Sequence, residues 1–151
     1  MKRIELTDAE IRISVTVATD RIISSLRKGH KQKHGYDGGN LWEVNVNGAA
    51  AELAYAKFRK EYFSASVDTY KDADHGEVTQ IRWTKHTRGK LIIREDDNPE
   101  HYYVLVVSPL PKMYISGFIK GSEVEDKYKT NFGIEGRPLV WAIPQDKLRR
   151  F

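Results

Sequence analysis

The stretch Tyr102–Val107, YYVLVV, is strongly apolar and rich in β-branched and aromatic residues, which are the residue types enriched in strands. Turn-forming sequences flank it, DDNP on the amino-terminal side and SPLP on the carboxyl-terminal side. We therefore expect Tyr102–Val107 to form the central strand of a sheet. Leu91–Arg94 and Met113–Ile119 are further strand candidates next to these turns.

Two helices are predicted before this region. Thr7 and Glu10 have the spacing of a capping box, so the first helix is expected from Thr7 to about Lys28. Asn47 can cap a second helix near residues 48–61, where alanine and other helix formers dominate. The first helix has one apolar stripe, formed by Ile11, Val15, Ala18, Ile22 and Leu26.

The remaining segments complete a pattern of helices followed by strands. Ser66–Tyr70 and Val78–Trp83 predict a β-hairpin with Gly76 between its strands. Gly121–Tyr128 predicts a short helix, and Leu139–Ile143 predicts a last extended segment. No linker divides the chain, so the pattern favours one α+β or mixed α/β domain over residues 1–151, with a central mixed β-sheet flanked by helices.

Composition narrows the function classes. The chain has 151 residues, enough for one compact core, and 25 Lys and Arg against 21 Asp and Glu give a net charge of +4. It has no cysteine, which excludes disulfides, a cysteine nucleophile and thiolate zinc sites. No apolar run approaches the roughly 20 residues that cross a bilayer, and the first residues lack a signal-peptide core. We therefore expect a cytoplasmic protein without membrane insertion.

Polar residues occur on segments that are otherwise suited to packing: Glu52, Asp74, Gln80 and Arg82. Because alternate residues of a strand share a face, Gln80 and Arg82 point the same way and Ile81 points oppositely. A three-residue turn before Val78 would place Asp74 diagonal to Gln80, with about 7–8 Å between Cα atoms. A two-residue turn would place Asp74 on the wrong face.

These groups suit a hard divalent cation. The neighbours of Glu52 on its helix face are mostly small, which would let the helix approach a sheet and deliver the carboxylate. The carboxylates of Glu52 and Asp74, the amide oxygen of Gln80 and the backbone carbonyl of Ile81 are ligands that Mg²⁺ or Mn²⁺ accepts. The sequence therefore predicts a site for one of these ions.

In this order the residues resemble the PD-(D/E)XK nuclease superfamily. Glu52 matches the helix carboxylate, Asp74 the first strand acid, Gln80 the second strand ligand and Arg82 the basic position. The chain from GAAAELAYAKF to ISGFIKG is also similar to small phage-encoded proteins of this superfamily, which extends the resemblance over about residues 8–148. It implies a restriction-endonuclease-like core and a Mg²⁺- or Mn²⁺-dependent hydrolase of DNA phosphodiester bonds, located in the host cytoplasm if phage-encoded.

Two positions depart from the superfamily pattern. Gln80 stands where Asp or Glu is usual, so the site has two carboxylates and should hold a divalent ion more weakly. Arg82 stands where Lys is usual, and because its guanidinium stays protonated it can stabilise charge on a phosphate but cannot act as a base. In the mechanism that the resemblance implies, the metal activates a water and Arg82 stabilises the developing charge.

A basic loop at about residues 28–40 is the best candidate for contact with a nucleic-acid backbone. Lys28, Lys31 and Lys33 of this loop and Arg27 just before it together create a local positive field. The alternative is a loop whose charges are simply solvated. Lys85 is a further DNA-contact candidate, or else an ordinary polar strand end.

Some of these residues also have a purely structural interpretation. A solvated helix face would account for Glu52 taken alone, and a turn accounts for Asp96 and Asp97 better than a metal site does. The departures at Gln80 and Arg82 make a non-catalytic nucleic-acid-binding or regulatory protein the main alternative function. A small interaction protein with the basic loop as its docking surface is a third. A homodimer is expected if both strands of a duplex are cut together.

Overall fold

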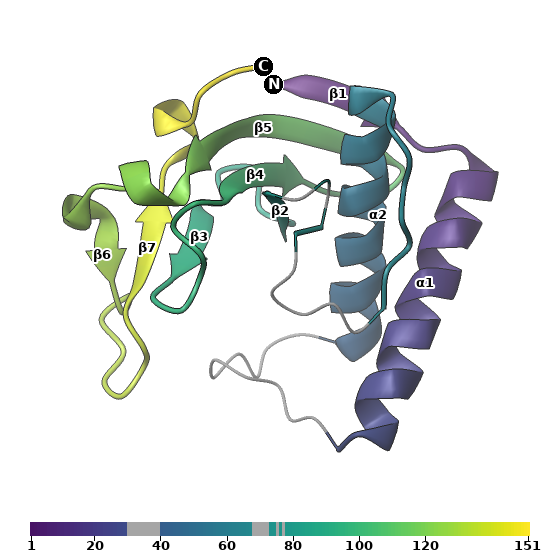
Figure 1. The fold of residues 1–151 in the computed structure, drawn as a ribbon, viewed down its shortest axis with the longest axis horizontal. Coiled ribbons are helices and arrows are strands. Elements are labelled where there is room, and N and C mark those ends of the chain that lie inside the picture. Colours follow the sequence, from purple (N-terminus) through teal and green to yellow (C-terminus); the bar gives the residue numbers. More distant parts are fainter. Residues whose placement is uncertain (30–39, 68–72, 75, 77) are drawn as a thin grey trace.

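The computed structural model describes residues 1–29, 40–67, 73–74, 76 and 78–151. Figure 1 shows helices on one side and strands on the other. The described elements are β1 (Lys2–Glu5), α1 (Asp8–Arg27), α2 (Leu41–Arg59), β2 (Thr79–Thr84), β3 (Leu91–Arg94), β4 (Tyr102–Val107), β5 (Lys112–Lys120), β6 (Lys129–Thr130), β7 (Val140–Ile143) and the 3₁₀ helices η1 (Gly121–Glu123), η2 (Asp126–Tyr128) and η3 (Gln145–Lys147).

The larger sheet, sheet A, has the strand order β1-β5-β4-β2. β2 runs parallel to β4, and the other two pairs are antiparallel. β4 has neighbours on both sides and is almost wholly buried, so the prediction of a central strand at Tyr102–Val107 is confirmed. Sheet A is therefore a mixed sheet with an interior apolar strand.

The smaller sheet, sheet B, is antiparallel with the order β3-β7-β6. It lies on the side of sheet A away from the helices (Figure 1). The two faces of β4 reach different cores: Val104 and Val106 pack with α2, whereas Tyr103 and Leu105 pack with sheet B. Successive side chains of a strand point to opposite faces. Because both faces of β4 are buried, apolar residues are needed at every position, which explains the continuous apolar run.

α2 lies between α1 and sheet A, and the two helices run antiparallel (Figure 1). Its residues 49–56 are buried without interruption, and alanine occupies five of those positions. A helix that is covered on opposite sides needs small residues where its neighbours approach. The chain is therefore a single small α+β domain in which α2 is the central helix.

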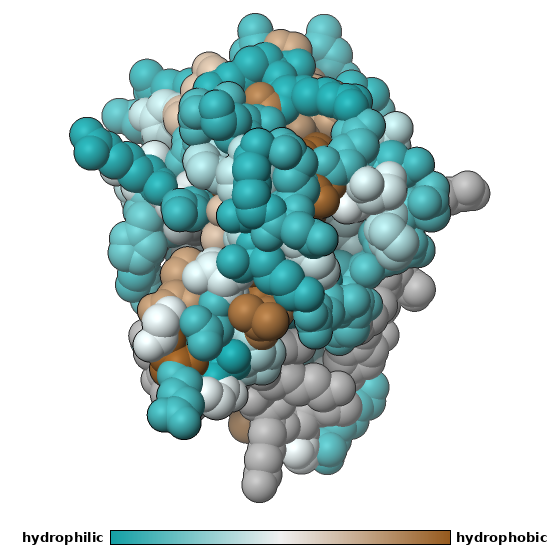
Figure 2. Space-filling view, turned by 90° about the vertical axis from the view of Figure 1, so that its left-hand side faces the viewer, coloured by the Kyte–Doolittle hydropathy of each residue, from teal (hydrophilic) through white to brown (hydrophobic). Residues whose placement is uncertain are grey.

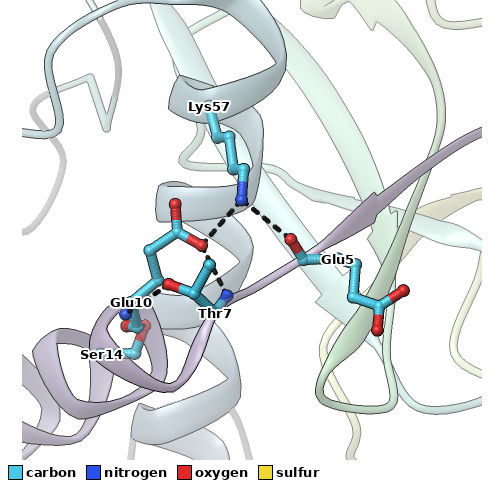
Figure 3. A network of polar contacts seen from close by, with 5 residues as sticks. All are labelled: Glu5, Thr7, Glu10, Ser14 and Lys57. Atoms are coloured by element: carbon cyan, nitrogen blue, oxygen red, sulfur yellow. Dashed lines mark hydrogen bonds and ion pairs between the residues drawn. The ribbon is translucent and has the colours of Figure 1, made fainter.

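The amino-terminal end of α1 is tied to the last turn of α2 (Figure 3). Thr7 caps α1 by accepting a hydrogen bond from the backbone N–H of Glu10, whose carboxylate accepts one from the N–H of Thr7 at 2.7 Å. Lys57 Nζ then donates to Glu10 Oε2 at 2.8 Å and to the backbone carbonyl of Glu5 at 2.9 Å. The predicted capping box is thus confirmed, and it also fixes how the two helices meet.

Several boundaries differ from the sequence predictions. α2 begins after Asn40, not Asn47, because Asn40 accepts a hydrogen bond from the N–H of Trp42. Asn47 lies inside the helix, where its side chain donates to the carbonyl of Glu43 and accepts from Ser108 Oγ. The predicted single helix at Gly121–Tyr128 is two separate 3₁₀ turns.

The predicted apolar stripe of α1 is only partly correct. Ala18 and Ile22 are buried, but Val15 and Leu26 are exposed. Ser14 is buried on the same side, with its hydroxyl satisfied by the carbonyl of Glu10. The buried face of α1 therefore includes Ser14 in place of Val15. A buried serine whose hydroxyl bonds to its own helix packs like a small apolar residue.

Two strand predictions also need correction. β1, which pairs with β5 at the opposite end of sheet A from β2, was not predicted from the sequence. Ser66 and Val67 are not in a strand, so the predicted hairpin partner does not begin there. Residues 68–72, 75 and 77 lie outside the described residues, and with them most of Ser66–Tyr70 and the proposed three-residue turn.

The described residues contain no helix that is both long enough and apolar enough to span a lipid bilayer. The face that carries sheet B is mostly hydrophilic, and its hydrophobic residues form small separate patches (Figure 2).

Candidate functional site

The edge of β2 that does not pair with β4 carries part of the candidate site. Val78 and Thr84 accept hydrogen bonds through their carbonyls from the N–H groups of Tyr102 and Ser108, at 2.7 and 2.9 Å. In a strand the N–H and C=O of one residue point to the same side. Even-numbered residues of β2 therefore bond to β4, and Ile81 directs its N–H and C=O to the opposite edge.

Asp74 lies at this edge. Its Oδ2 accepts a 2.6 Å hydrogen bond from the backbone N–H of Ile81, and its Oδ1 makes no hydrogen bond to a described residue. The carbonyl of Ile81 points to the same side as its N–H. One carboxylate oxygen and one carbonyl oxygen are thus presented together at the edge of β2.

The charge state of Asp74 depends on its surroundings. Burial, followed by the negative charge of Glu52, raises the pKa of Asp74 from 3.8 to about 7. The hydrogen bond from Ile81 and the positive charges of Arg82 and Arg21 act in the opposite direction. Asp74 is therefore electrostatically coupled to the other candidate acid, Glu52, and to two arginines.

Glu52 forms a bidentate ion pair with Arg21 of α1. The N–O distances are 2.8 and 2.6 Å, and the two side chains are 11% and 19% exposed. Arg21 Nε also donates to the backbone carbonyl of Ser66 at 2.9 Å. A buried carboxylate requires such a partner, so Glu52 is not a solvated helix residue.

Arg21 is a site residue that was not predicted from the sequence. It follows Ser14 and Ala18 on the inward face of α1, and is adjacent to the buried Ile22. A long cation on an otherwise buried helix face was the signal that it has an internal carboxylate partner. The predicted apolar stripe did not reveal this signal, because it included the exposed Val15 and Leu26 and left out the polar residues of the buried face.

Arg82 extends from the other face of sheet A. Ile81 packs in the core formed with α2, so strand alternation directs Arg82 toward sheet B. There Arg82 donates to Asp97 Oδ1 at 2.8 Å and lies 5.6 Å from the centre of the Tyr103 ring. Asp97 also accepts from the backbone N–H of Arg94 at 2.8 Å. The predicted turn at Asp97 is confirmed, and it has the added role of orienting Arg82.

Gln80 has the same orientation as Arg82 and is only 5% exposed. In the pairing of β2 with β4, Gln80 lies opposite Tyr103. The structure therefore brings Asp74 together with Glu52, Arg21 and Ile81 on one side, while Gln80 and Arg82 start from the opposite face of the same strand.

The arrangement offers hard oxygen donors without forming a complete metal cage. Within the described residues, no group of three or more His, Cys, Asp or Glu is placed to hold a metal ion. Oδ1 of Asp74 has no hydrogen-bond partner among the described residues, and each oxygen of Glu52 has a second lone pair beyond the one that Arg21 uses. The donor chemistry thus fits Mg²⁺ or Mn²⁺, with Arg21 as a cation already present beside Glu52.

The predicted DNA-contact residues are only partly described. Arg27 lies exposed in the last turn of α1, and Lys28 is its C-cap residue. Lys31 and Lys33, with almost all of the basic loop, lie outside the described residues. Lys85 follows β2 and forms an ion pair with Glu43 at 3.3 Å.

Comparison of this chain with protein-family models, curated protein sequences and solved structures finds no match.

Proposed function

We propose that this protein is a metal-dependent nuclease that hydrolyses DNA phosphodiester bonds at the edge of β2 that does not pair with β4. The proposal includes a restriction-endonuclease-like core made of α2, the segment that ends at Asp74, and β2. Their order along the chain is the order of the helix acid, the strand acid and the basic strand position in PD-(D/E)XK nucleases.

The observation that carries the proposal is the position of Asp74. It is a largely buried carboxyl group, bound to the backbone of Ile81, within electrostatic reach of Glu52, Arg21 and Arg82. Burying two acids near one another lowers the stability of a fold. Their presence is therefore better explained by a function than by stability. Strongly perturbed acids in such clusters are typical of functional sites.

Each residue has a distinct role in this proposal. Glu52, Asp74 and the carbonyl of Ile81 would hold the ion, and Gln80 would add an amide oxygen from the other face of β2. When bound, Mg²⁺ or Mn²⁺ supplies a water of lowered pKa and neutralises phosphate charge. Arg21 orients Glu52, and Arg82, held by Asp97, offers its remaining N–H groups to the scissile phosphate.

A specific observation favours a second candidate, a non-catalytic nucleic-acid-binding protein with a nuclease-like fold. Both oxygens of Glu52 are occupied by Arg21, and Arg82 is paired with Asp97. Internal ion pairs of this kind would also be found in a site that has lost its metal. The two candidates differ in whether Asp74 is required for cleavage.

The test is a cleavage assay on circular single-stranded and supercoiled double-stranded DNA with Mg²⁺, Mn²⁺ or EDTA. The proposal expects metal-dependent cutting that is lost in Asp74→Asn and Glu52→Gln. Asp146→Asn, which makes the same chemical change at an exposed acid paired with its neighbour Lys147, is the matched control and should cut normally.

Cutting that survives in Asp74→Asn would contradict the proposed site. Absence of cutting on DNA and RNA, together with salt-sensitive DNA binding, would favour the second candidate. Concerted double-strand cutting is expected only with two copies of the chain, which sedimentation in the presence of DNA would detect.

A further inference from the structure

A cavity of about 650 Å³ opens between β2 and sheet B. Its walls come from β2, from the end of β3, from the start of α2 and from the chain between β6 and β7. Ile81 and Arg82 of the candidate site are among its lining residues. The cavity therefore adjoins the proposed cleavage site along β2.

The cavity wall has more positive than negative side chains. Five Lys or Arg residues line it against three acids. One of those acids, Glu43, is paired with Lys85, and another, Glu95, is paired with Lys129 outside the cavity. The cations with no ion pair in the described part of the chain are Lys90, Arg94 and Arg137. The wall thus has uncompensated positive charge in a partly enclosed space, which attracts anions.

Two arginines, Arg82 and Arg94, line the cavity. Burial, and then the positive charge of Arg82, lower the pKa of Arg94, whereas Asp97 and Asp96 act in the opposite direction. Arg82 uses one terminal nitrogen for Asp97, and the described chain contains no partner for its Nε. Asp97 already accepts a hydrogen bond from Arg82 and offsets part of the charge of Arg94. The guanidinium of Arg82 has further N–H groups beyond the one that Asp97 uses, and a phosphate group has the charge and the oxygen geometry to accept hydrogen bonds from two arginines.

Apolar side chains and an aromatic ring also line the cavity. Ile92, Leu105 and Leu139 line it, and so does Phe132, which is 45% exposed. The guanidinium of Arg137 lies 4.9 Å from the centre of the Phe132 ring. An exposed ring stacked with an arginine is a platform on which a nucleobase can stack.

We propose that this cavity binds one unpaired nucleotide of a single-stranded nucleic acid, with its phosphate at Arg82 and Arg94 and its base on Phe132. The inference rests on the proposed function for the choice of nucleic acid as the anion. A base in a duplex is stacked and paired, so its face is not available to Phe132. The cavity volume lies within the range of pockets that enclose small ligands.

The experiment measures binding of a fluorescent 12-nucleotide oligothymidylate and of a 12-base-pair duplex by anisotropy. EDTA is present throughout, so that no metal-dependent cleavage of the oligonucleotides occurs during the measurement. Single-stranded binding should exceed duplex binding at equal salt. Phe132→Ala and Arg137→Ala should each weaken single-stranded binding about tenfold and should change duplex binding much less.

Matched controls separate this effect from general changes in charge or apolarity. Ile134→Ala removes an exposed apolar side chain of the same loop that does not line the cavity. Arg12→Ala removes one positive charge from the exposed face of α1. Both should bind as the unaltered protein does. Phe132 is exposed and Arg137 is partly buried, and circular dichroism checks that both variants fold.

The results distinguish this inference from the proposed function. If the protein cuts DNA but Phe132→Ala and Arg137→Ala bind like the controls, the cavity proposal is wrong and the nuclease proposal stands. If these variants lose single-stranded binding and the unaltered protein cuts nothing, the cavity proposal stands and the nuclease proposal fails. Absence of binding to any nucleic acid by the unaltered protein overturns both.

Discussion

The Oδ2 atom of Asp74 accepts a 2.6 Å hydrogen bond from the backbone N–H of Ile81, at the edge of β2 that does not pair with β4. This bond satisfies a strand-edge donor and fixes the carboxyl group beside the outward-pointing carbonyl of Ile81. A single contact thus links the local geometry of the strand to the candidate chemistry. Glu52 and its partner Arg21 influence Asp74 through charge.

Protein stability is expected to fall as pH rises through the acid range because of Asp74. Its pKa is raised from 3.8 unfolded to about 7 folded, so the folded protein binds the extra proton between these values. The stabilisation is therefore complete below pH 4 and is lost as pH approaches 7, by at most about 1.4 kcal/mol per pH unit. Urea unfolding of the unaltered protein and of Asp74→Asn from pH 4 to 8 measures it.

Asp74→Asn keeps an oxygen for the Ile81 N–H and removes the titration. The variant should lose this part of the pH dependence and be the more stable of the two proteins at pH 8. Asp146→Asn, at an exposed acid, should retain the pH profile of the unaltered protein. Parallel stability curves for the unaltered protein and Asp74→Asn would show that Asp74 is not the titrating group.

Divalent cation binding is expected to stabilise the fold independently of any cleavage. A ligand that binds only the folded state at a hundredfold excess over its Kd contributes about 2.7 kcal/mol. Mn²⁺ or Mg²⁺ should therefore raise the unfolding temperature of the unaltered protein, and should have little effect on Asp74→Asn. Ca²⁺ and a matched concentration of NaCl separate site binding from ionic strength. An equal rise in unfolding temperature in the unaltered protein and in Asp74→Asn would mean that the cation binds at a site without Asp74.

The sequence identified the elements whose signals are local. The capping box at Thr7, the strand Leu91–Arg94 and the apolar strand Tyr102–Val107 all follow from residue type and spacing, and the structure contains each of them. The start of α2 was misplaced because Asn40 and Asn47 are equally good caps by type. In the structure Asn40 caps α2, and Asn47 lies inside the helix with its side chain bonded to Glu43 and to Ser108, which is far along the chain.

The candidate site was predictable only in part. The order of Glu52, Asp74 and Arg82 could be recognised, but their partners could not. Arg21 and Asp97 lie 31 and 15 residues from the groups they bind, and no local pattern fixes such distances. The strand alternation of Gln80 and Arg82 was correctly inferred, whereas the side on which α2 packs depended on the tertiary fold.

The buried pair of Arg21 and Glu52 is expected to act as a unit. Arg21→Met leaves a buried carboxylate without its cation and should destabilise the protein by about 3–5 kcal/mol. Adding Glu52→Gln removes the orphaned charge and should recover much of that loss. Chemical unfolding of both single variants and the double variant gives the coupling energy.

An exposed ion pair provides the comparison. Arg59 and Glu61 are each 46% exposed, and Arg59→Met should change stability by less than about 1 kcal/mol. If Arg21→Met is as mild as Arg59→Met, the carboxylate of Glu52 is compensated by another group, and the described ion pair is not what stabilises it.

Two glycine substitutions should have opposite effects because their surroundings differ. A Cβ at Gly117 would overlap the carbonyl oxygen of Arg149 and lie 2.9 Å from Leu148 Cβ. That segment is held to β5 by two backbone hydrogen bonds between Phe118 and Arg149, at 3.0 and 2.9 Å. Gly117→Ala should therefore displace the carboxyl-terminal segment and destabilise the protein by about 1–3 kcal/mol.

At Gly48, inside α2, a Cβ would lie 3.7 Å from Trp83 Nε1, an ordinary contact distance. Alanine is the better helix former by about 1 kcal/mol, so Gly48→Ala should raise the unfolding temperature. Thermal unfolding of both variants against the unaltered protein measures the two effects. A loss of stability in Gly48→Ala would mean that α2 and β2 are packed more closely than the 3.7 Å separation implies.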